Sequence, residues 1–177
     1  MRFNILSNGT LITEEWAEFL HSTKRCNYVQ VSIDGSIPIT HDSFRGEGNF
    51  KRAIEGIKNL QKYNVSATVR VTIHKNNVHD LENIAKLLLE DIGLPSFSTN
   101  SASYMGLCRQ YTDEIMLSPE ERTLAMEKLL VLVEKYNGRI SATAGPLAEG
   151  RAWLEMEQNR VGKKEPVPGR GFLTGCG

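Results

Sequence analysis

The chain has 177 residues, 40% of them hydrophobic, which suffices for the core of one ordinary domain or of part of a larger one. Lysine plus arginine equals aspartate plus glutamate at 21 each, so no net charge attracts nucleic acid or an anionic membrane surface. No apolar run approaches the roughly 20 residues that span a bilayer, and three cysteines make no disulfide framework, so we expect a cytoplasmic protein without nucleic-acid or membrane partners.

Short runs rich in β-branched residues alternate with helical patterns, which is typical of parallel βαβ units. Four strands are predicted, at residues 3–6, 28–33 and 67–73 and beginning at Phe97. Thr13 is the expected N-cap of the first helix between them. Trp16, Phe19 and Leu20 recur at helical spacing and predict one buried face.

A polar stretch at residues 98–112 follows the fourth strand and is longer than most connections in compact domains, which favours a functional role. The clearest helix then begins at Ser118, whose hydroxyl is an N-cap, and Glu121 completes a capping box. This helix is predicted to end at Gly138. The remaining predictions are a strand at 139–144, a helix at 147–159 and a linker at 161–170.

Polar residues follow each predicted strand. They are Asn8-Gly9, Asp34-Gly35, the segment 74–77, and Asn100-Ser101. Ligands gather at the carboxyl ends of parallel strands, so these residues predict a polar rim at one edge of the sheet. Asn-Gly and Asp-Gly are also ordinary turn sequences, and spacing alone leaves a set of tight turns as the alternative.

The histidines and cysteines predict no metal site. The four histidines form no pair at ligand-like spacing, so we expect them to make hydrogen bonds rather than to bind zinc. Cys26 and Cys108 are expected to be small buried side chains or free thiols. Cys176 lies in the Gly-Cys-Gly at the end of the sequence, far from Cys26 and Cys108. An iron-sulfur cluster bound at Cys176 needs further ligands. We therefore expect the chain to be a fragment of a longer protein.

Four segments in order resemble radical S-adenosylmethionine (SAM) enzymes that carry a C-terminal SPASM extension. The segments are residues 6–12, residues 31–35 with His41, Asp42 and Arg45, residues 50–63 with 69–77, and residues 175–177. The first is similar to the run after the third barrel strand, and the second to the fourth-strand signature with its loop. The last resembles the first cysteine of the SPASM region.

This resemblance implies a fold, two cofactors and a division of the chain. The fold is the second half of a partial, TIM-like (β/α)6 barrel of parallel βαβ units, at residues 1–145, and residues 146–177 lead into a truncated SPASM extension. The family cleaves S-adenosylmethionine with a [4Fe-4S] cluster to give a 5′-deoxyadenosyl radical. The Cys-x3-Cys-x2-Cys loop that binds this cluster and the Gly-Gly-Glu of the second strand are absent from the sequence.

Site residues follow from the same resemblance. Ser32 is expected to contact the ribose or carboxylate of S-adenosylmethionine, and Arg45 to clamp its carboxylate. Further expected cofactor contacts are Asp34, Asn8, Asn100 and Ser101. Cys176 is expected to bind an auxiliary cluster in the full-length protein. Arg70, in the middle of a strand, points either inward to the substrate or outward between helices.

The expected function is that of an enzyme fragment whose parent modifies a peptide or small protein. The isolated fragment is expected to be inactive and to bind no complete cluster, because one thiolate at Cys176 does not supply the ligand set. Exposed strand edges predict self-association. The alternative is a cluster-free α/β module that binds a small molecule or a peptide.

Overall fold

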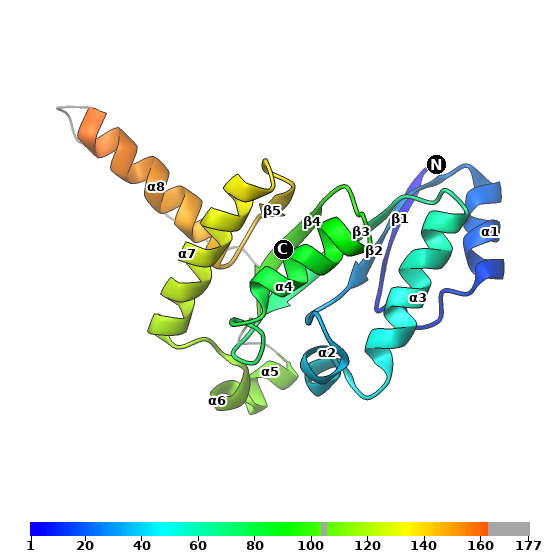
Figure 1. Cartoon of the computed structure of the whole chain (residues 1–177), viewed down its shortest axis with the longest axis horizontal. Coiled ribbons are helices and arrows are strands. Elements are labelled where there is room, and N and C mark those ends of the chain that lie inside the picture. The colour runs from blue at the N-terminus through cyan, green and yellow to red at the C-terminus, as the bar shows by residue number, and fades with distance from the viewer. Residues whose placement is uncertain (104–105, 163–177) are drawn as a thin grey trace.

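A computed structural model describes residues 1–103 and 106–162 of the chain. Its centre is a parallel sheet with the strand order β1-β2-β3-β4-β5, so strand order equals sequence order (Figure 1). The strands are β1 (Phe3–Ser7), β2 (Cys26–Ser32), β3 (Ala67–Ile73), β4 (Phe97–Ser101) and β5 (Ile140–Ala142). The predicted parallel α/β architecture is therefore confirmed.

Helices connect consecutive strands and pack on the sheet and on one another. They are α1 (Glu14–Thr23), α2 (Pro38–Arg45), α3 (Asn49–Lys62), α4 (Leu81–Lys86) with its π-helical continuation (Leu87–Asp91), α5 (Leu107–Gln110), α6 (Thr112–Ile115), α7 (Pro119–Lys135) and α8 (Pro146–Gly162). Helix α8 packs along α7, and its far end extends away from the sheet (Figure 1). None of the helices in the described part of the chain has the length and apolar character needed to cross a bilayer.

Local signals explain where helices begin. The Thr13 hydroxyl accepts a hydrogen bond from the Trp16 amide at the start of α1. At the start of α7, Ser118 and Glu121 form the predicted capping box, with Pro119 at the first helical position. Both predicted helix starts are confirmed.

The two faces of the sheet differ in chemistry. Along β3, residues alternate strictly between buried and half-buried, and the buried ones are the apolar Ala67, Val69, Val71 and Ile73. These side chains belong to one core cluster with apolar residues of α3, α4 and α7. Residues paired across parallel strands share a face, which assigns the following side chains to the opposite, polar face: Gln30, Ser32, Thr68, Arg70, Thr72, Ser98 and Asn100.

The structure corrects two sequence-based predictions about this framework. Trp16 and Phe19 are 56% and 57% exposed, whereas Ala17 and Leu20 are the buried residues of α1. The rings instead contact each other edge to face, with centroids 5.8 Å apart. The predicted polar loop at 98–112 is also wrong at its start, because residues up to Ser101 continue β4. Most of the predicted linker and Cys176 lie outside the described residues.

Two glycines bring the turn after β1 against α3. Gly9 has a φ of +79°, and a Cβ at this position would lie 2.6 Å from Val31 Cγ1. A Cβ at Gly56 in α3 would lie 2.4 Å from the Gly9 carbonyl oxygen. Backbone therefore meets backbone here, and this contact fixes the turn that carries Asn8 relative to β2.

Gly56→Ala is expected to lower the free energy of unfolding by about 1 to 3 kcal/mol, as measured by urea titration. Alanine favours a helix over glycine by about 1 kcal/mol, but the added Cβ has no room against a backbone oxygen. Gly150→Ala in α8 is the matched control, because its Cβ would meet only side-chain atoms, of Leu130 at 3.3 Å and of Met126 at 3.7 Å. Equal stability of Gly56→Ala and the wild type would contradict the steric argument.

Candidate functional site

The carboxyl ends of β1 to β4 meet at one edge of the parallel sheet, as the polar rim required. Asn8 lies in the exposed turn after β1, where its Oδ1 accepts hydrogen bonds from the Thr10 amide and hydroxyl. Ser32 ends β2, is half-buried, and makes no side-chain hydrogen bond within the described residues. Ser101 ends β4 and is also half-buried.

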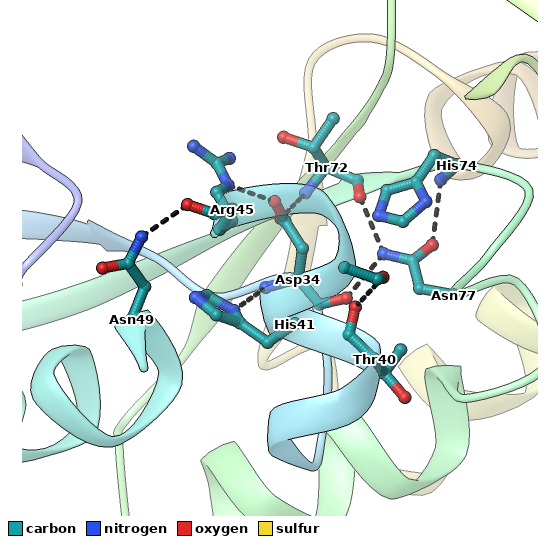
Figure 2. A network of polar contacts seen from close by, with 9 residues as sticks. Asp34, Thr40, His41, Arg45, Asn49, Thr72, His74 and Asn77 are labelled. Carbon is teal, nitrogen blue, oxygen red and sulfur yellow. Dashed lines mark hydrogen bonds and ion pairs between the residues drawn. The ribbon is translucent and has the colours of Figure 1, made fainter. Parts of the chain in front are cut away.

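Asp34 is the centre of a buried polar network behind this rim (Figure 2). Its side chain has no exposed surface, and its carboxylate accepts hydrogen bonds from Arg45 Nε and, at 2.7 Å, from the Thr72 amide. Its backbone amide donates to His41 Nδ1 at 3.0 Å, and its carbonyl accepts from Asn77 Nδ2 at 2.9 Å. The carboxylate therefore ties the loop after β2 to β3 instead of standing free at the rim.

Arg45 lies at the last turn of α2, with 28% of its side chain exposed. Its Nε is bound to Asp34, and its carbonyl accepts a hydrogen bond from the Asn49 side chain. The other two guanidinium nitrogens make no hydrogen bond or ion pair with the described residues, and the guanidinium carbon lies 5.6 Å from the centroid of the Phe44 ring. Asp34 thus orients a guanidinium whose outer edge is available to an anion.

Sequence reasoning gave the histidines no chemistry beyond hydrogen bonding, yet two of them are buried in this network. Burial lowers the pKa of His41 and lowers the pKa of His74 to about 4. The His74 ring stacks on Phe44 with centroids 4.2 Å apart, and its Nδ1 accepts from the Asn76 amide. Its Nε2 therefore carries the proton of the neutral ring. The segment 74–77 was predicted at the rim, but the network itself was missed.

Three buried side-chain atoms of the described residues have no hydrogen-bond partner. They are His74 Nε2, just after β3, and Thr99 Oγ1 and Asn100 Oδ1, near the end of β4. An unpaired buried polar atom is costly, so such atoms in a folded protein need an explanation, which a ligand provides. Asn100 lies on the polar face of the sheet, near the strand end where the sequence predicts a ligand, whereas Thr99 is paired with the core residue Val71 on the apolar face.

Comparison with known proteins shows which superfamily this part of the chain matches. The model of the Radical SAM superfamily matches residues 1–88, from β1 into the π-helix after α4. Three curated relatives named for maturation reactions are each 34% identical to this chain over 82 to 89 residues. Residues 1–88 of the chain belong to the radical SAM superfamily. The resemblance to radical SAM proteins inferred from residues 6–12 and 31–35 is confirmed.

Individual relatives of this radical SAM chain differ in what they make. The chain is 38% identical over 138 residues to Fe-coproporphyrin III synthase of Methanosarcina barkeri. This alignment covers 77% of the chain and 34% of the relative. The chain is 34% identical over 89 residues to the cysteine-type anaerobic sulfatase-maturating enzyme of Clostridium novyi. This alignment covers 48% of the chain and 23% of the relative. The chain spans about a third or less of the length of the curated relatives it matches.

The radical SAM fold is also found among solved structures. The structure of native anSMEcpe with bound AdoMet superimposes with a TM-score of 0.66 at 19% identity, covering 94% of this chain and 44% of that one. At this identity the likeness shows the fold alone. It supports the assignment of the five parallel strands to part of a TIM-like barrel.

The two cofactors of radical SAM proteins fit this chain differently. The unpaired polar atoms of His74 and Asn100 fit a polar ligand such as S-adenosylmethionine at the carboxyl edge. The thiols do not fit a [4Fe-4S] cluster, which needs several thiolates together. Cys26 begins β2 at the opposite edge, where its Sγ donates to the Tyr28 carbonyl and burial raises the pKa of its thiol. No group of three metal-binding side chains occurs among the described residues.

Proposed function

We propose that this chain forms the second half of the barrel of a radical SAM enzyme and binds S-adenosylmethionine at the carboxyl ends of its strands. The observation that carries this proposal is the polar edge with unpaired buried atoms near the ends of β3 and β4, within a chain of this superfamily. In a complete enzyme, S-adenosylmethionine cleaved by one electron from a reduced [4Fe-4S] cluster would supply the radical that takes a hydrogen atom from the substrate. The protein's part is to hold and orient the ligands and to exclude water.

Ser32 and Arg45 are the proposed contacts to the cofactor's ribose and carboxylate. Ser32 ends β2 with an unengaged hydroxyl, and Arg45 presents the outer edge of its guanidinium while Asp34 holds Nε. Asn8, Asn100 and Ser101 complete the proposed cofactor edge. Asp34 acts in this proposal by positioning Arg45, because its own carboxylate is fully buried.

The catalytic cluster is proposed to be bound by cysteines other than those in this sequence. The three cysteines at 26, 108 and 176 have no Cys-x3-Cys-x2-Cys spacing, and the relatives are about three times as long or longer. Cys176 is proposed as a ligand of an auxiliary cluster in a SPASM extension, with residues 1–145 as the barrel part. A complete enzyme of this kind therefore needs more polypeptide than these 177 residues.

Two substrate classes are proposed. A peptide or small protein is supported by relatives named for sulfatase maturation, sporulation killing factor maturation and mycofactocin maturation. A porphyrin is the second candidate. It is favoured by the 38% identity to Fe-coproporphyrin III synthase, whose alignment extends over 77% of the chain.

The decisive experiment compares this chain with the complete polypeptide encoded by its reading frame. After anaerobic reconstitution with iron and sulfide, the complete polypeptide is expected to form 5′-deoxyadenosine from S-adenosylmethionine and a reductant, and the 177-residue chain is expected to form none. A complete polypeptide that lacks Cys-x3-Cys-x2-Cys and forms no 5′-deoxyadenosine would support the alternative, a cluster-free binding module.

Ser32→Ala and Arg45→Ala are expected to weaken S-adenosylmethionine binding to the reconstituted polypeptide while leaving its cluster content unchanged. Loss of a charge-assisted hydrogen bond is worth about 1.5 to 3 kcal/mol, hence roughly ten- to a hundredfold in affinity for Arg45 and less for the neutral Ser32. Arg45→Lys is expected to restore binding partly, since it keeps the charge but loses the fork. Titration calorimetry showing wild-type affinity in both alanine variants would remove the assignment.

We further propose that the isolated chain self-associates through its β1 end. β1 is an edge strand, and apolar side chains at this end are exposed: Leu6 by 73%, Leu11 by 78%, Trp16 by 56% and Phe19 by 57%. Sedimentation of the chain is expected to show dimers or larger species, and Trp16→Glu is expected to shift them towards monomers. A monomeric wild type at high concentration would contradict the proposal.

A further inference from the structure

Arg70 stands out on the polar face of the sheet because of its charge. Among the strand residues that the structure assigns to this face, Arg70 is the one charged side chain. Its Nε donates to Ser98 Oγ at 3.4 Å, and no carboxylate of the described residues forms an ion pair with it. A partly exposed guanidinium without a counter-charge is free to pair with an anion from outside.

The surroundings of Arg70 are those of an anion site. In register, Ser32 lies beside it on β2 and Ser98 on β4, so a hydroxyl flanks the guanidinium on either side. Arginine with one nitrogen held by a neighbour retains two nitrogens that match the two oxygens of a carboxylate.

We propose that Arg70 binds a carboxylate of the substrate on the polar face of the sheet. The proposal rests on the proposed function, in which Ser32 and Arg45 hold S-adenosylmethionine. Because Ser32 and Arg70 are register neighbours, a substrate held by Arg70 lies beside a cofactor held by Ser32. Such proximity is what hydrogen-atom abstraction requires. The carboxylate belongs either to a porphyrin propionate or to an acidic residue of a peptide, and both present the same group.

Direct binding to the 177-residue chain tests the proposal without cluster or turnover. The probes are coproporphyrin III with its methyl ester, and an oligoglutamate peptide with its glutamine counterpart, followed by tryptophan fluorescence and calorimetry. Arg70→Gln is expected to weaken binding of one carboxylate probe by about ten- to a hundredfold, and Arg70→Lys by less. The ester or glutamine counterpart is expected to bind weakly to all variants. The probe that responds identifies the source of the carboxylate.

Arg25→Gln is the matched control, because Arg25 is an exposed arginine between α1 and β2, at the opposite edge of the sheet. Circular dichroism checks that each variant is folded. S-adenosylmethionine binding is expected to be unchanged in Arg70→Gln. Three results would overturn the inference: no binding of either carboxylate probe by the wild type, equal binding by Arg70→Gln, or loss of S-adenosylmethionine binding in that variant.

Failure of the proposed function gives a different result. If the 177-residue chain binds a carboxylate probe through Arg70 but the complete polypeptide forms no 5′-deoxyadenosine, the Arg70 site is retained and the proposed radical chemistry is withdrawn. If the complete polypeptide forms 5′-deoxyadenosine but Arg70→Gln binds the carboxylate probes as well as the wild type does, the radical chemistry is retained and the Arg70 site is withdrawn.

Discussion

Replacing Asp34 with alanine is expected to lower the free energy of unfolding of the chain by about 3 to 5 kcal/mol in urea titrations. The carboxylate is fully buried, and its removal leaves Arg45 Nε and the Thr72 amide without an acceptor. Unpaired buried donors of this kind account for the largest losses seen in point variants. Asp91→Ala is the control, since Asp91 is an exposed carboxylate at the end of the π-helix.

A double-mutant cycle separates the ion pair from the rest of the network. Arg45→Ala leaves the Asp34 carboxylate buried with only the Thr72 amide as a partner of its oxygens. The free energy of unfolding lost in the double variant is therefore expected to be smaller than the sum of the two single losses. The difference is expected to be at least about 1 kcal/mol. Strictly additive losses would show that Asp34 and Arg45 are not coupled and that Arg45 is not positioned by this carboxylate.

Acid is expected to destabilise the chain through His74. The pKa of His74 is about 4 in the folded state because of burial, with Arg45 also disfavouring the charge and Asp34 opposing both effects. An unfolded histidine has a pKa of about 6.5, so the unfolded chain binds the proton more readily. The stabilising contribution is complete above pH 6.5 and is lost as the pH falls towards 4, by about 3 kcal/mol in total.

His74→Phe removes the titrating group while keeping an aromatic ring against Phe44. Between pH 7 and pH 4, the wild type is expected to lose about 3 kcal/mol more stability than this variant. His41, whose pKa burial also lowers, is present in both proteins and cancels in the difference. Parallel pH profiles, or a His74 that titrates near its ordinary value in NMR spectra, would contradict the prediction.

The order of elements was predictable because periodicity and caps are local properties. The alternation of strand and helix patterns gave the parallel sheet, and Ser118 with Glu121 gave the start of α7. The failure at α1 has a physical reason. Helical spacing defines a face but not which face meets the core, and here the buried side includes the small Ala17 whereas Trp16 is exposed.

The candidate site was predictable only in part. The predicted strands placed Asn8 and Ser32 at strand ends, where ligands gather in parallel sheets, and the structure has both residues there. The network around Asp34 joins the loop after β2, the helix α2 and the end of β3, and no local pattern indicates such a contact. The orientation of Arg70 was open from the sequence. Its buried neighbours Val69 and Val71 mean that alternation alone places it on the other face.

The strand order has a consequence for how the chain folds. Each strand pairs with its neighbour in sequence, so the sheet contains no pairing that skips a unit. Each new strand pair therefore costs only the loop-closure entropy of one βαβ connection. Assembly can start at the pair β2 and β3 and spread outward. The short outer strand β5 and the exposed strand β1 are expected to form last and to open first, as measured by amide hydrogen exchange. A ligand that contacts Asn8 after β1 would therefore slow the opening of the weakest edge.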